Sequence, residues 1–258
     1  MPSMPELRRV HAQMLDLLKY FDAFCEEHGV RYSLHGGTLL GAIREHGFIP
    51  WDDDVDVTLT RDNYERFRDA ARKGPLMEHV RFSEYSSQHP RMWLRRPGEP
   101  GAWIDLFIYD NISENRLARK LKLLGCAFFL AFTKTKESMG LSHRTGAKAV
   151  LVNLGYQLGR IFPVKFKAKL MNAWGKHALR GRRTLIHRSN DLYADNGLFV
   201  ILPTQTMAEY TRVPFEDTEL MVTTRWDDVL TSSYGADYMT PRREASHDNP
   251  AHAGFKEA

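Results

Sequence analysis

The chain has 258 residues, of which 43% are hydrophobic and 26% are charged. This length is enough for one large domain or two small ones. The composition is that of a globular protein, and it argues against a disordered, collagen-like or multispan membrane chain. A total of 36 Lys and Arg against 32 Asp and Glu gives a formal net charge of +4.

That small net charge hides an uneven distribution. Residues 113–190 contain 17 Lys and Arg but only two acids, a net charge of +15, whereas the rest of the chain contains 19 Lys and Arg and 30 acids, a net charge of −11. A basic segment of this kind suggests an anionic partner, either nucleic acid or a membrane surface. A set of helices with solvated basic faces is an equally good interpretation.

The chain shows no sign of export or of membrane insertion. Its two cysteines, Cys25 and Cys126, provide neither a disulfide framework nor a zinc cluster. The first residues lack the basic and apolar regions of a secretory signal. The longest apolar run, 123–132, is shorter than the roughly 20 residues needed to span a bilayer. We therefore expect a cytoplasmic protein.

Apolar periodicity predicts the elements of the first half. Apolar residues recur at steps of three and four between 6 and 28, which indicates an amphipathic helix, and acidic and apolar residues alternate over 54–59, which indicates a half-buried strand. A second amphipathic helix is expected at 61–73. The other expected elements are a strand at 30–34, a turn at 35–37, a short helix at 38–45, and strands at 79–85, 91–95 and 103–109.

The pattern changes in the second half. From 113 to about 180 it is helical, basic and apolar, and from 190 onward short strands and turns precede a last helix at 226–234. Strands dominate the first half and helices the middle. The predicted fold class is therefore α+β.

Four carboxylates lie within five positions of the segment 51–57, Trp-Asp-Asp-Asp-Val-Asp-Val. Carboxylates this close repel one another unless a cation or solvent compensates their charge. On a strand, Asp52, Asp54 and Asp56 would share one face while the apolar residues bury the other. Converging carboxylates suit Mg²⁺ or Mn²⁺. A solvated acidic turn is the alternative.

A glycine pair, Gly36-Gly37, precedes Thr38 between an expected strand and an expected helix. Backbone N–H groups at a helix N-terminus favour phosphate, and glycine allows a close approach of the backbone. The turn is a weak signal alone, but it becomes a strong one beside an acidic strand. A phosphate cradle next to a divalent cation is what phosphoryl or nucleotidyl transfer requires.

Asp105 is a lone acid within the apolar segment 103–109. An unpaired charge there would be costly, so a metal ion or a basic partner is expected to compensate it. Asp105 is therefore the candidate for a third carboxylate of the site. The alternative is a core aspartate held by backbone donors or by an arginine.

These segments resemble the LicD family, which includes phosphocholine transferases and is related to the fukutin-like proteins. The resemblance rests on 36–44 (GGTLLGAIR), 47–57 (GFIPWDDDVDV), 104–107 (IDLF), 213–217 (VPFED), Tyr234-Gly235, Asp237-Tyr238-Met239, Pro241 and His247. It extends over nearly the whole chain except 113–195. One departure is Ala236, which interrupts the usual Tyr-Gly-Asp-Tyr run.

The resemblance implies a nucleotidyltransferase-like fold, a small mixed sheet with flanking helices. Residues 1–112 would form the catalytic core, 113–190 a basic helical insertion, and 191–258 a part that completes the catalytic domain. The implied activity is metal-dependent transfer of a phosphorylated alcohol, such as phosphocholine, from a CDP-activated donor to a hydroxyl of a surface glycan. The glycan would be of the lipopolysaccharide or teichoic acid kind, and CMP would be released.

The family pattern also implies roles for individual residues. Asp54, Asp56 and Asp105 would be catalytic and would bind Mg²⁺ or Mn²⁺, and Asp105 would also be a candidate to accept the proton of the attacking hydroxyl. The residues implied to contact substrate are Gly36, Gly37, Thr38, Arg44, Trp51, Asp52, Tyr238 and His247.

Two other functions remain open from the sequence. The same motifs fit nucleotidyl transfer to a sugar, a small molecule or RNA, in which pyrophosphate would leave. The basic segment alone would fit a nucleic-acid-binding module, but the chain has no recognised signature of one, so nucleic acid is not an expected partner. Basic and apolar residues interleave within 113–190, which suits peripheral docking on the anionic inner face of a membrane, where a lipid-linked glycan acceptor would lie.

Overall fold

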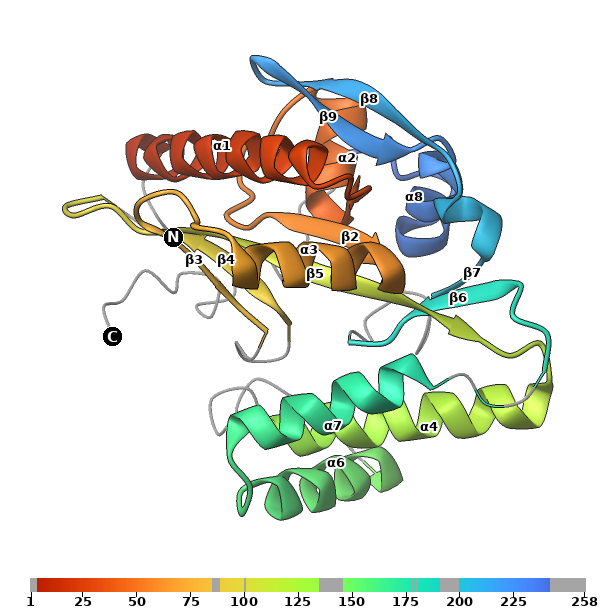
Figure 1. The fold of residues 1–258 in the computed structure, drawn as a ribbon. Coiled ribbons are helices and arrows are strands. Elements are labelled where there is room, and N and C mark those ends of the chain that lie inside the picture. Colours follow the sequence, from red (N-terminus) through yellow and green to blue (C-terminus); the bar gives the residue numbers. More distant parts are fainter. Residues whose placement is uncertain are drawn as a thin grey trace. The chain divides into compact units, whose positions relative to one another are not determined.

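The structure is a computed structural model of the chain, and it describes residues 4–84, 89–99, 101–134, 146–177, 179, 181–190 and 200–241. The chain divides into two compact units. The first comprises 1–82, 91–106 and 206–258, and the second comprises 83–90 and 107–205. Both contain helices and strands (Figure 1), which confirms the α+β fold class. The boundaries expected at 112 and 190 stay a prediction.

A five-stranded arrangement forms the centre of the first unit, in the order β1, β2, β5, β4, β3. The strands are β1 (Ser33–Leu34), β2 (Asp56–Thr60), β3 (Val80–Ser83), β4 (Arg91–Leu94) and β5 (Ala102–Ile112), and a separate two-stranded sheet consists of β8 (Tyr210–Phe215) and β9 (Thr218–Thr223). β4 runs antiparallel to β5 with Arg91 opposite Asp105. The register therefore places a basic residue directly beside Asp105.

The helices of this unit follow the predicted periodicity. They are α1 (Met4–Glu27), α2 (Gly36–Arg44), α3 (Arg61–Lys73) and α8 (Trp226–Tyr234). In α1, Val10, Met14, Leu17 and Phe21 are fully buried, so the three- and four-residue spacing marks the core-facing side. The helices predicted at 61–73 and 226–234 are confirmed with the same bounds.

Two local predictions near the glycine pair need correction. Gly36 and Gly37 form the first turn of α2 and not a separate turn before it. Gly36 has a φ of +54°, a left-handed conformation that glycine adopts without a steric penalty. β2 begins only at Asp56, so Asp52 and Asp54 lie in the irregular segment that leads into the strand.

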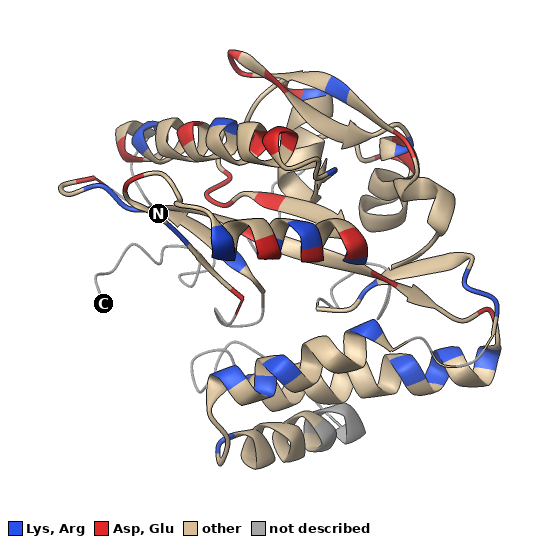
Figure 2. Ribbon diagram, viewed as in Figure 1, with Lys and Arg blue, Asp and Glu red and all other residues tan. Residues whose placement is uncertain are grey.

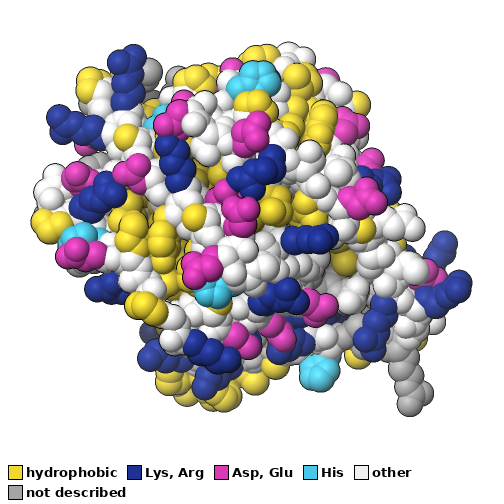
Figure 3. Space-filling model, turned by 45° about the horizontal axis from the view of Figure 1, so that its top comes forward, with side chains coloured by type: hydrophobic (Ala, Val, Ile, Leu, Met, Phe, Trp, Pro, Cys, Tyr) yellow, Lys and Arg dark blue, Asp and Glu magenta, His cyan; other side chains and the backbone are white. Residues whose placement is uncertain are grey.

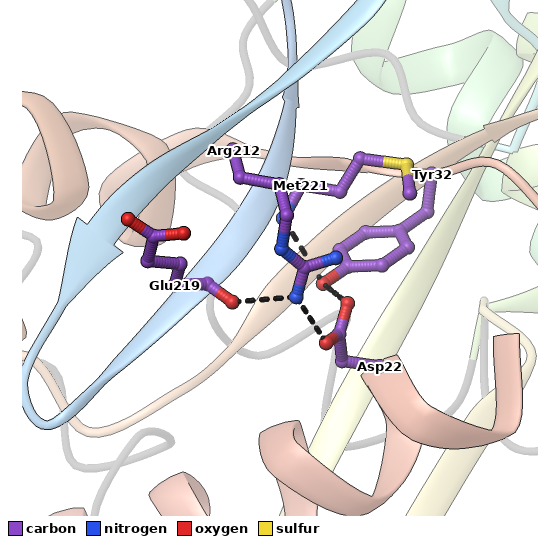
Figure 4. Close-up of polar contacts among 5 residues, drawn as sticks. All are labelled: Asp22, Tyr32, Arg212, Glu219 and Met221. Carbon is purple, nitrogen blue, oxygen red and sulfur yellow. Dashed lines mark hydrogen bonds and ion pairs between the residues drawn. The ribbon is translucent and has the colours of Figure 1, made fainter. Parts of the chain in front are cut away.

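A buried carboxylate links α1 to the β8–β9 hairpin (Figure 4). Asp22 accepts a hydrogen bond of 2.8 Å from the Tyr32 hydroxyl and a second from the Arg212 guanidinium. Arg212 also donates to the Glu219 carbonyl oxygen at 2.7 Å, and the Met221 N–H donates to the Tyr32 hydroxyl at 3.3 Å. Segments separated by 190 residues are thereby joined by one polar network.

In its described residues, the second unit combines a small sheet with three helices. The second half of β5 pairs antiparallel with β6 (Leu185–Arg188), β6 pairs with β7 (Ile201–Pro203), and η1 (Thr204–Met207) follows. The helices α4 (Arg116–Thr133), α6 (Gly146–Gly159) and α7 (Val164–Lys176) are the helical part predicted for this region. Both α6 and α7 pack against α4 (Figure 1).

Lys122 fixes α4 to the end of α7. Its ammonium group is almost completely buried and donates to the carbonyl oxygens of Trp174, Gly175 and His177 at 2.6, 2.6 and 2.8 Å. The last carbonyls of a helix lack partners within the helix, so the buried cation satisfies them and opposes the negative end of the helix dipole. One of the 17 basic residues of the segment is therefore structural.

The charge asymmetry of the sequence is visible on the helices (Figure 2). Residues 116–134 and 146–177 contain eleven Lys and Arg and no Asp or Glu. Elsewhere, charges of both signs are interspersed on the face drawn in Figure 3. Of the helices that the structure describes, none combines the length and the apolar character that crossing a bilayer requires.

Removal of the Arg212 cation tests the Asp22 network. Arg212→Met should lower the free energy of unfolding by about 1.5–3 kcal/mol, because the Asp22 carboxylate loses a charged partner while staying largely buried. The matched control is Lys19→Met, which breaks the Lys19–Asp217 pair. The two cations have similar side-chain exposure, 37% and 38%, but Asp217 is 68% exposed against 12% for Asp22. Urea unfolding should show a change within about 0.5 kcal/mol for the control; equal losses would contradict the prediction.

A buried histidine should make the second unit sensitive to acid. His187 is fully buried, and neither ring nitrogen has a hydrogen-bond partner among the described residues. Burial lowers its pKa to about 4, although the nearby Asp110 acts in the opposite direction. The neutral ring is therefore favoured in the folded state, while an unfolded histidine takes up a proton near pH ~6.5.

As the pH falls below 6.5, the unfolded chain binds a proton that the folded chain refuses until about pH 4, so the free energy of unfolding decreases. Between pH ~7.5 and pH ~5 this decrease amounts to about 2 kcal/mol. His187→Phe keeps an aromatic ring but removes the titration. Urea unfolding at both pH values should show about 2 kcal/mol less acid sensitivity in the variant, and an identical decrease in both proteins would disprove the assignment.

Candidate active site

Two carboxylates lie against the two glycines that begin α2. A Cβ atom added to Gly36 would be 2.8 Å from Oδ2 of Asp56, and one added to Gly37 would be within 3.0 Å of Oδ2 of Asp52. Real Cβ atoms do not approach other atoms this closely. The glycine pair therefore provides the space into which the acidic segment folds, and it brings Asp52 and Asp56 to the same helix N-terminus.

Backbone hydrogen bonds hold this junction in place. The His35 N–H donates to the Asp56 carbonyl oxygen at 2.9 Å, and the Asp56 N–H donates to Oγ1 of Thr38 at 3.0 Å. The Thr38 hydroxyl oxygen thus accepts a hydrogen bond from the first residue of β2, and the hydroxyl hydrogen can still be donated to another group. The order of residues from β1 through α2 to β2 is what places the carboxylates at the glycines.

Asp52 is strongly perturbed by its surroundings. Burial raises its pKa well above the usual range, and the charges of Asp54 and Asp53, together with a hydrogen bond to the Asp54 carboxyl group, raise it further. Nε2 of His11 donates to the Asp52 carbonyl oxygen at 2.7 Å, and the His11 ring stacks on Phe48. A buried carboxyl group in contact with another must take up a proton or be balanced by a cation.

Asp105 lies on the strand next to β2, and its N–H donates to the Val55 carbonyl oxygen at 2.8 Å. Both of its oxygens accept from Arg91, at 2.6 Å from Nε and 2.7 Å from Nη2. The guanidinium group is also 5.1 Å from the centre of the Trp103 ring. The alternative of an aspartate held by an arginine is therefore the arrangement seen in this structure.

The predicted metal ligands thus lie on neighbouring segments of the fold, but their side chains do not converge on one position. Among the residues that the structure describes, no three His, Cys, Asp or Glu side chains are gathered as they would be to hold a metal ion. The set of Asp54, Asp56 and Asp105 as metal ligands stays a prediction. The contacts establish an acidic cluster at α2, in which Asp52 is buried and Asp54 and Asp56 are half-buried, and an Asp105 that is paired separately with Arg91.

The 213–217 block has a structural role that sequence reasoning missed. Oε1 of Glu216 accepts from the Phe48 N–H at 3.0 Å, and the Glu216 N–H donates to the His46 carbonyl oxygen at 2.7 Å. A Cβ on Gly47 would fall within 3.0 Å of Oε1 of Glu216. The turn between β8 and β9 therefore supports the loop that leads to the acidic segment.

The remaining predicted site residues are engaged in other ways. Arg44 donates from Nη1 to the Tyr238 carbonyl oxygen at 3.3 Å and from Nε to Glu45 at 2.7 Å, and the Tyr238 hydroxyl donates to Asp227. Trp51 is half-buried beside the acidic run. His247 lies outside the described residues. The contacts of these four residues with a substrate stay predictions.

Residues 29–123 match the family model described as LicD/FKTN/FKRP, nucleotidyltransferase domain. This part of the chain is therefore similar to the nucleotidyltransferase domain of the LicD family. The matched range contains the glycine pair, the acidic run, Arg91 and Asp105, so the whole candidate site as built from contacts falls inside it.

Two named relatives place this match in context. The lipopolysaccharide cholinephosphotransferase LicD of Haemophilus influenzae is 34% identical over 168 residues, which cover 59% of this chain and 63% of the relative. The human ribitol 5-phosphate transferase FKRP is 34% identical over 92 residues, which cover 29% of this chain and 19% of FKRP. The chain therefore spans under two thirds of the length of these curated relatives.

Two glycines of α2 should respond differently to the same added methyl group. A Cβ on Gly41 would fall within 3.0 Å of the Gly47 carbonyl oxygen, which is backbone and cannot turn away, whereas a Cβ on Gly37 meets only the Asp52 carboxylate. We expect Gly41→Ala to lower the free energy of unfolding by about 1–3 kcal/mol. Gly37→Ala should stay within about 1 kcal/mol of the wild type, because a side chain can rotate. Urea unfolding of both variants is the measurement, and the opposite order would refute the packing described here.

Proposed function

We propose that the chain transfers a phosphorylated alcohol from a CDP-activated donor to a hydroxyl group of a surface glycan and releases CMP. The observation that carries this proposal is the close approach of the Asp52 and Asp56 carboxylates to the glycine pair, inside the range that matches the LicD family model. Amide groups at a helix N-terminus favour phosphate, and adjacent carboxylates favour a divalent cation.

The names of the relatives support the chemical class. One is a cholinephosphotransferase that acts on lipopolysaccharide, and the other is a ribitol 5-phosphate transferase. Both names describe transfer of an alcohol that carries a phosphate group, yet the alcohols differ. We therefore propose the class and leave choline, ethanolamine, glycerol and ribitol as alternative donors, with lipopolysaccharide or teichoic acid as the kind of acceptor.

The acidic cluster fits a Mg²⁺ or Mn²⁺ ion as part of this proposal. Asp52 and Asp54 are in contact, and burial first, then the charges of Asp54 and Asp53, raise the pKa of Asp52. Mg²⁺ is commonly bound through one or two carboxylates together with substrate phosphates, so a preformed cage of three protein ligands is not required. Asp54 and Asp56 would hold the ion, with Asp52 beside them, and its chemistry would be to neutralise the donor phosphates.

In the proposed reaction, the oxygen of the acceptor hydroxyl attacks the phosphorus atom distal to the nucleoside. The bond from that phosphorus to the bridging oxygen breaks, and CMP leaves with the electron pair. The hydroxyl proton passes to a carboxylate, for which Asp105 is the candidate. Arg91 is then a positioning residue, because its two hydrogen bonds fix the orientation of the Asp105 carboxylate while leaving lone pairs on both oxygens.

The proposal includes a cytoplasmic location with peripheral docking on the inner face of the membrane, because a lipid-linked glycan acceptor would be presented there. Nucleotidyl transfer is the competing reaction for the same site. In that case the phosphorus next to the nucleoside is attacked and pyrophosphate leaves. The identity of the released product separates the two reactions.

The direct test incubates the chain with CDP-choline, CDP-ethanolamine, CDP-glycerol and CDP-ribitol in the presence of Mg²⁺. Release of CMP and of the phosphorylated alcohol, measured by chromatography, is the expected result with at least one donor, and chelation of the metal should abolish it. Release of pyrophosphate from a nucleoside triphosphate, without CMP release from any CDP-alcohol, would instead establish nucleotidyl transfer and overturn the proposal.

Substitution of the acidic run tests the assignment of residues. Asp54→Asn and Asp56→Asn should each lower CMP release at least about 100-fold, because a neutral amide cannot balance a divalent cation. Asp53→Asn is the matched control, since it removes one charge from the same run without touching the implied ligands, and its activity should stay within about threefold of the wild type. Urea unfolding should give similar midpoints for all three variants. Full activity of Asp54→Asn and Asp56→Asn would exclude the proposed site.

A further inference from the structure

The helices of the second unit expose an unusual amount of apolar surface. In the described part of the chain, thirteen large hydrophobic residues are exposed, and eleven of them lie between 117 and 166. They occupy α4, α6, the connection between α6 and α7, and the start of α7. We call the exposed apolar residues of 117–128, 150–158 and 161–166 the apolar helical surface.

The exposed residues are not scattered at random along each helix. In α4 they are Leu117, Leu121, Leu124 and Phe128, which are separated by steps of four, three and four and are 43–68% exposed. Residues at this spacing share one face of a helix. In α6 the exposed apolar residues at 150, 154 and 158 recur at steps of four. Each helix thus presents a continuous apolar stripe to its surroundings.

Small residues, by contrast, lie where the helices meet. Gly155 and Gly159 are four residues apart in α6, and a Cβ on Gly155 would be 2.8 Å from Cβ of Ala131. On Gly159 it would come within 3.0 Å of the Phe132 carbonyl oxygen in α4. Large residues outside and small residues between helices are typical of helices that pack in an apolar medium, where close backbone approach drives association.

Ring contacts join the stripe of α4 to the start of α7. The ring centres of Phe128 and Phe132 are 5.9 Å apart, those of Phe132 and Phe162 are 5.5 Å apart, and those of Phe162 and Phe166 are 5.2 Å apart. The exposed rings of Phe128 and Phe162 are therefore connected through the buried ring of Phe132.

Basic side chains accompany the apolar helical surface. The described residues 116–134 and 146–177 contain eleven Lys and Arg and no acid (Figure 2), and of these Lys122, Lys134 and Lys167 are buried. Exposed Lys120 stands next to Leu121, and exposed Lys165 stands between Val164 and Phe166. A surface that is both apolar and positively charged matches an anionic bilayer, which offers hydrocarbon under a layer of negative head groups.

We propose that the apolar helical surface docks on an anionic lipid bilayer, with its leucine and phenylalanine side chains at the acyl boundary and its Lys and Arg among the head groups. None of the described helices meets the criteria for crossing a membrane, so the contact is peripheral. A second copy of the chain would bring two acid-free basic faces together, and nucleic acid would leave the aliphatic stripe uncovered. The surface lies outside the acidic cluster, so docking does not depend on the proposed transfer reaction.

Flotation of the full chain with vesicles tests this inference. The probes are vesicles of phosphatidylcholine alone and of phosphatidylcholine with about 30% phosphatidylserine, each at about 50 mM and about 500 mM NaCl. We expect binding to the anionic vesicles, with a marked loss at the higher salt concentration. Absence of binding to anionic vesicles at low salt would overturn the proposal.

Two double variants separate the apolar and the electrostatic contributions. Leu121→Gln with Leu124→Gln should weaken vesicle binding at least about tenfold, because apolar side chains supply part of the binding. The control is Met77→Gln with Met239→Gln, which changes the two exposed large hydrophobic residues outside the surface. Lys165→Gln with Lys169→Gln should weaken binding about 30-fold, from about 1 kcal/mol per basic residue. Arg72→Gln with Lys73→Gln, exposed at the end of α3, is the charge control.

The substituted residues are exposed, so thermal unfolding should be nearly unchanged in all four variants. Equal losses in the variants and in their controls would show that the surface is not the contact. Sedimentation should find the same oligomeric state with and without the leucine substitutions. A dimer that these substitutions dissociate would show that a second copy covers the surface. Binding of RNA to the vesicle-free protein through the same basic residues would assign the surface to nucleic acid. Either result would overturn the proposal.

Discussion

The architecture of the first unit depends on placing like charges together beside a helix N-terminus. Asp52 and Asp56 lie where the side chains of Gly37 and Gly36 would otherwise stand, and Asp52 also touches Asp54. Bringing carboxylates out of water and next to one another is unfavourable unless something positive compensates them. The carboxylates lie at the start of α2, the end at which a helix dipole favours negative charge. The repulsion is local, and it is confined to the range that matches the LicD family model.

Much of the fold followed from local periodicity. The apolar spacing of α1, the bounds of α3 and the last helix, and the alternation before β2 all reflect contacts that a residue makes within one or two turns of its own element. The glycine pair and the acidic run were recognisable because the residues that give each motif its chemistry are consecutive in the sequence. Their meeting at one helix end could be expected from the short separation of α2 and β2, and the contacts of Gly36 and Gly37 show how it occurs.

Residue pairs that depend on strand register, or that lie far apart in the chain, could not be predicted from the sequence. Arg91 faces Asp105 only because β4 and β5 pair in one particular antiparallel register, and a shift of one residue would point it to the other side. Lys122 is a basic residue in a basic segment, and nothing local distinguishes it from its exposed neighbours until α7 ends beside it. For α4 and α6, composition predicted helices, but the inward position of the glycines decides which large residues are left outside.

The support of the acidic loop by Glu216 has a consequence for how this protein matures during synthesis. The matched range 29–123 contains every carboxylate of the candidate site, but the carboxylate and the N–H that hold the Phe48 loop come from a turn almost 170 residues later. A nascent chain that has emerged only as far as the end of the matched range has no hairpin against which to order this loop. We therefore expect this loop, and the acidic run that follows it, to become ordered only after residue 216 has left the ribosome.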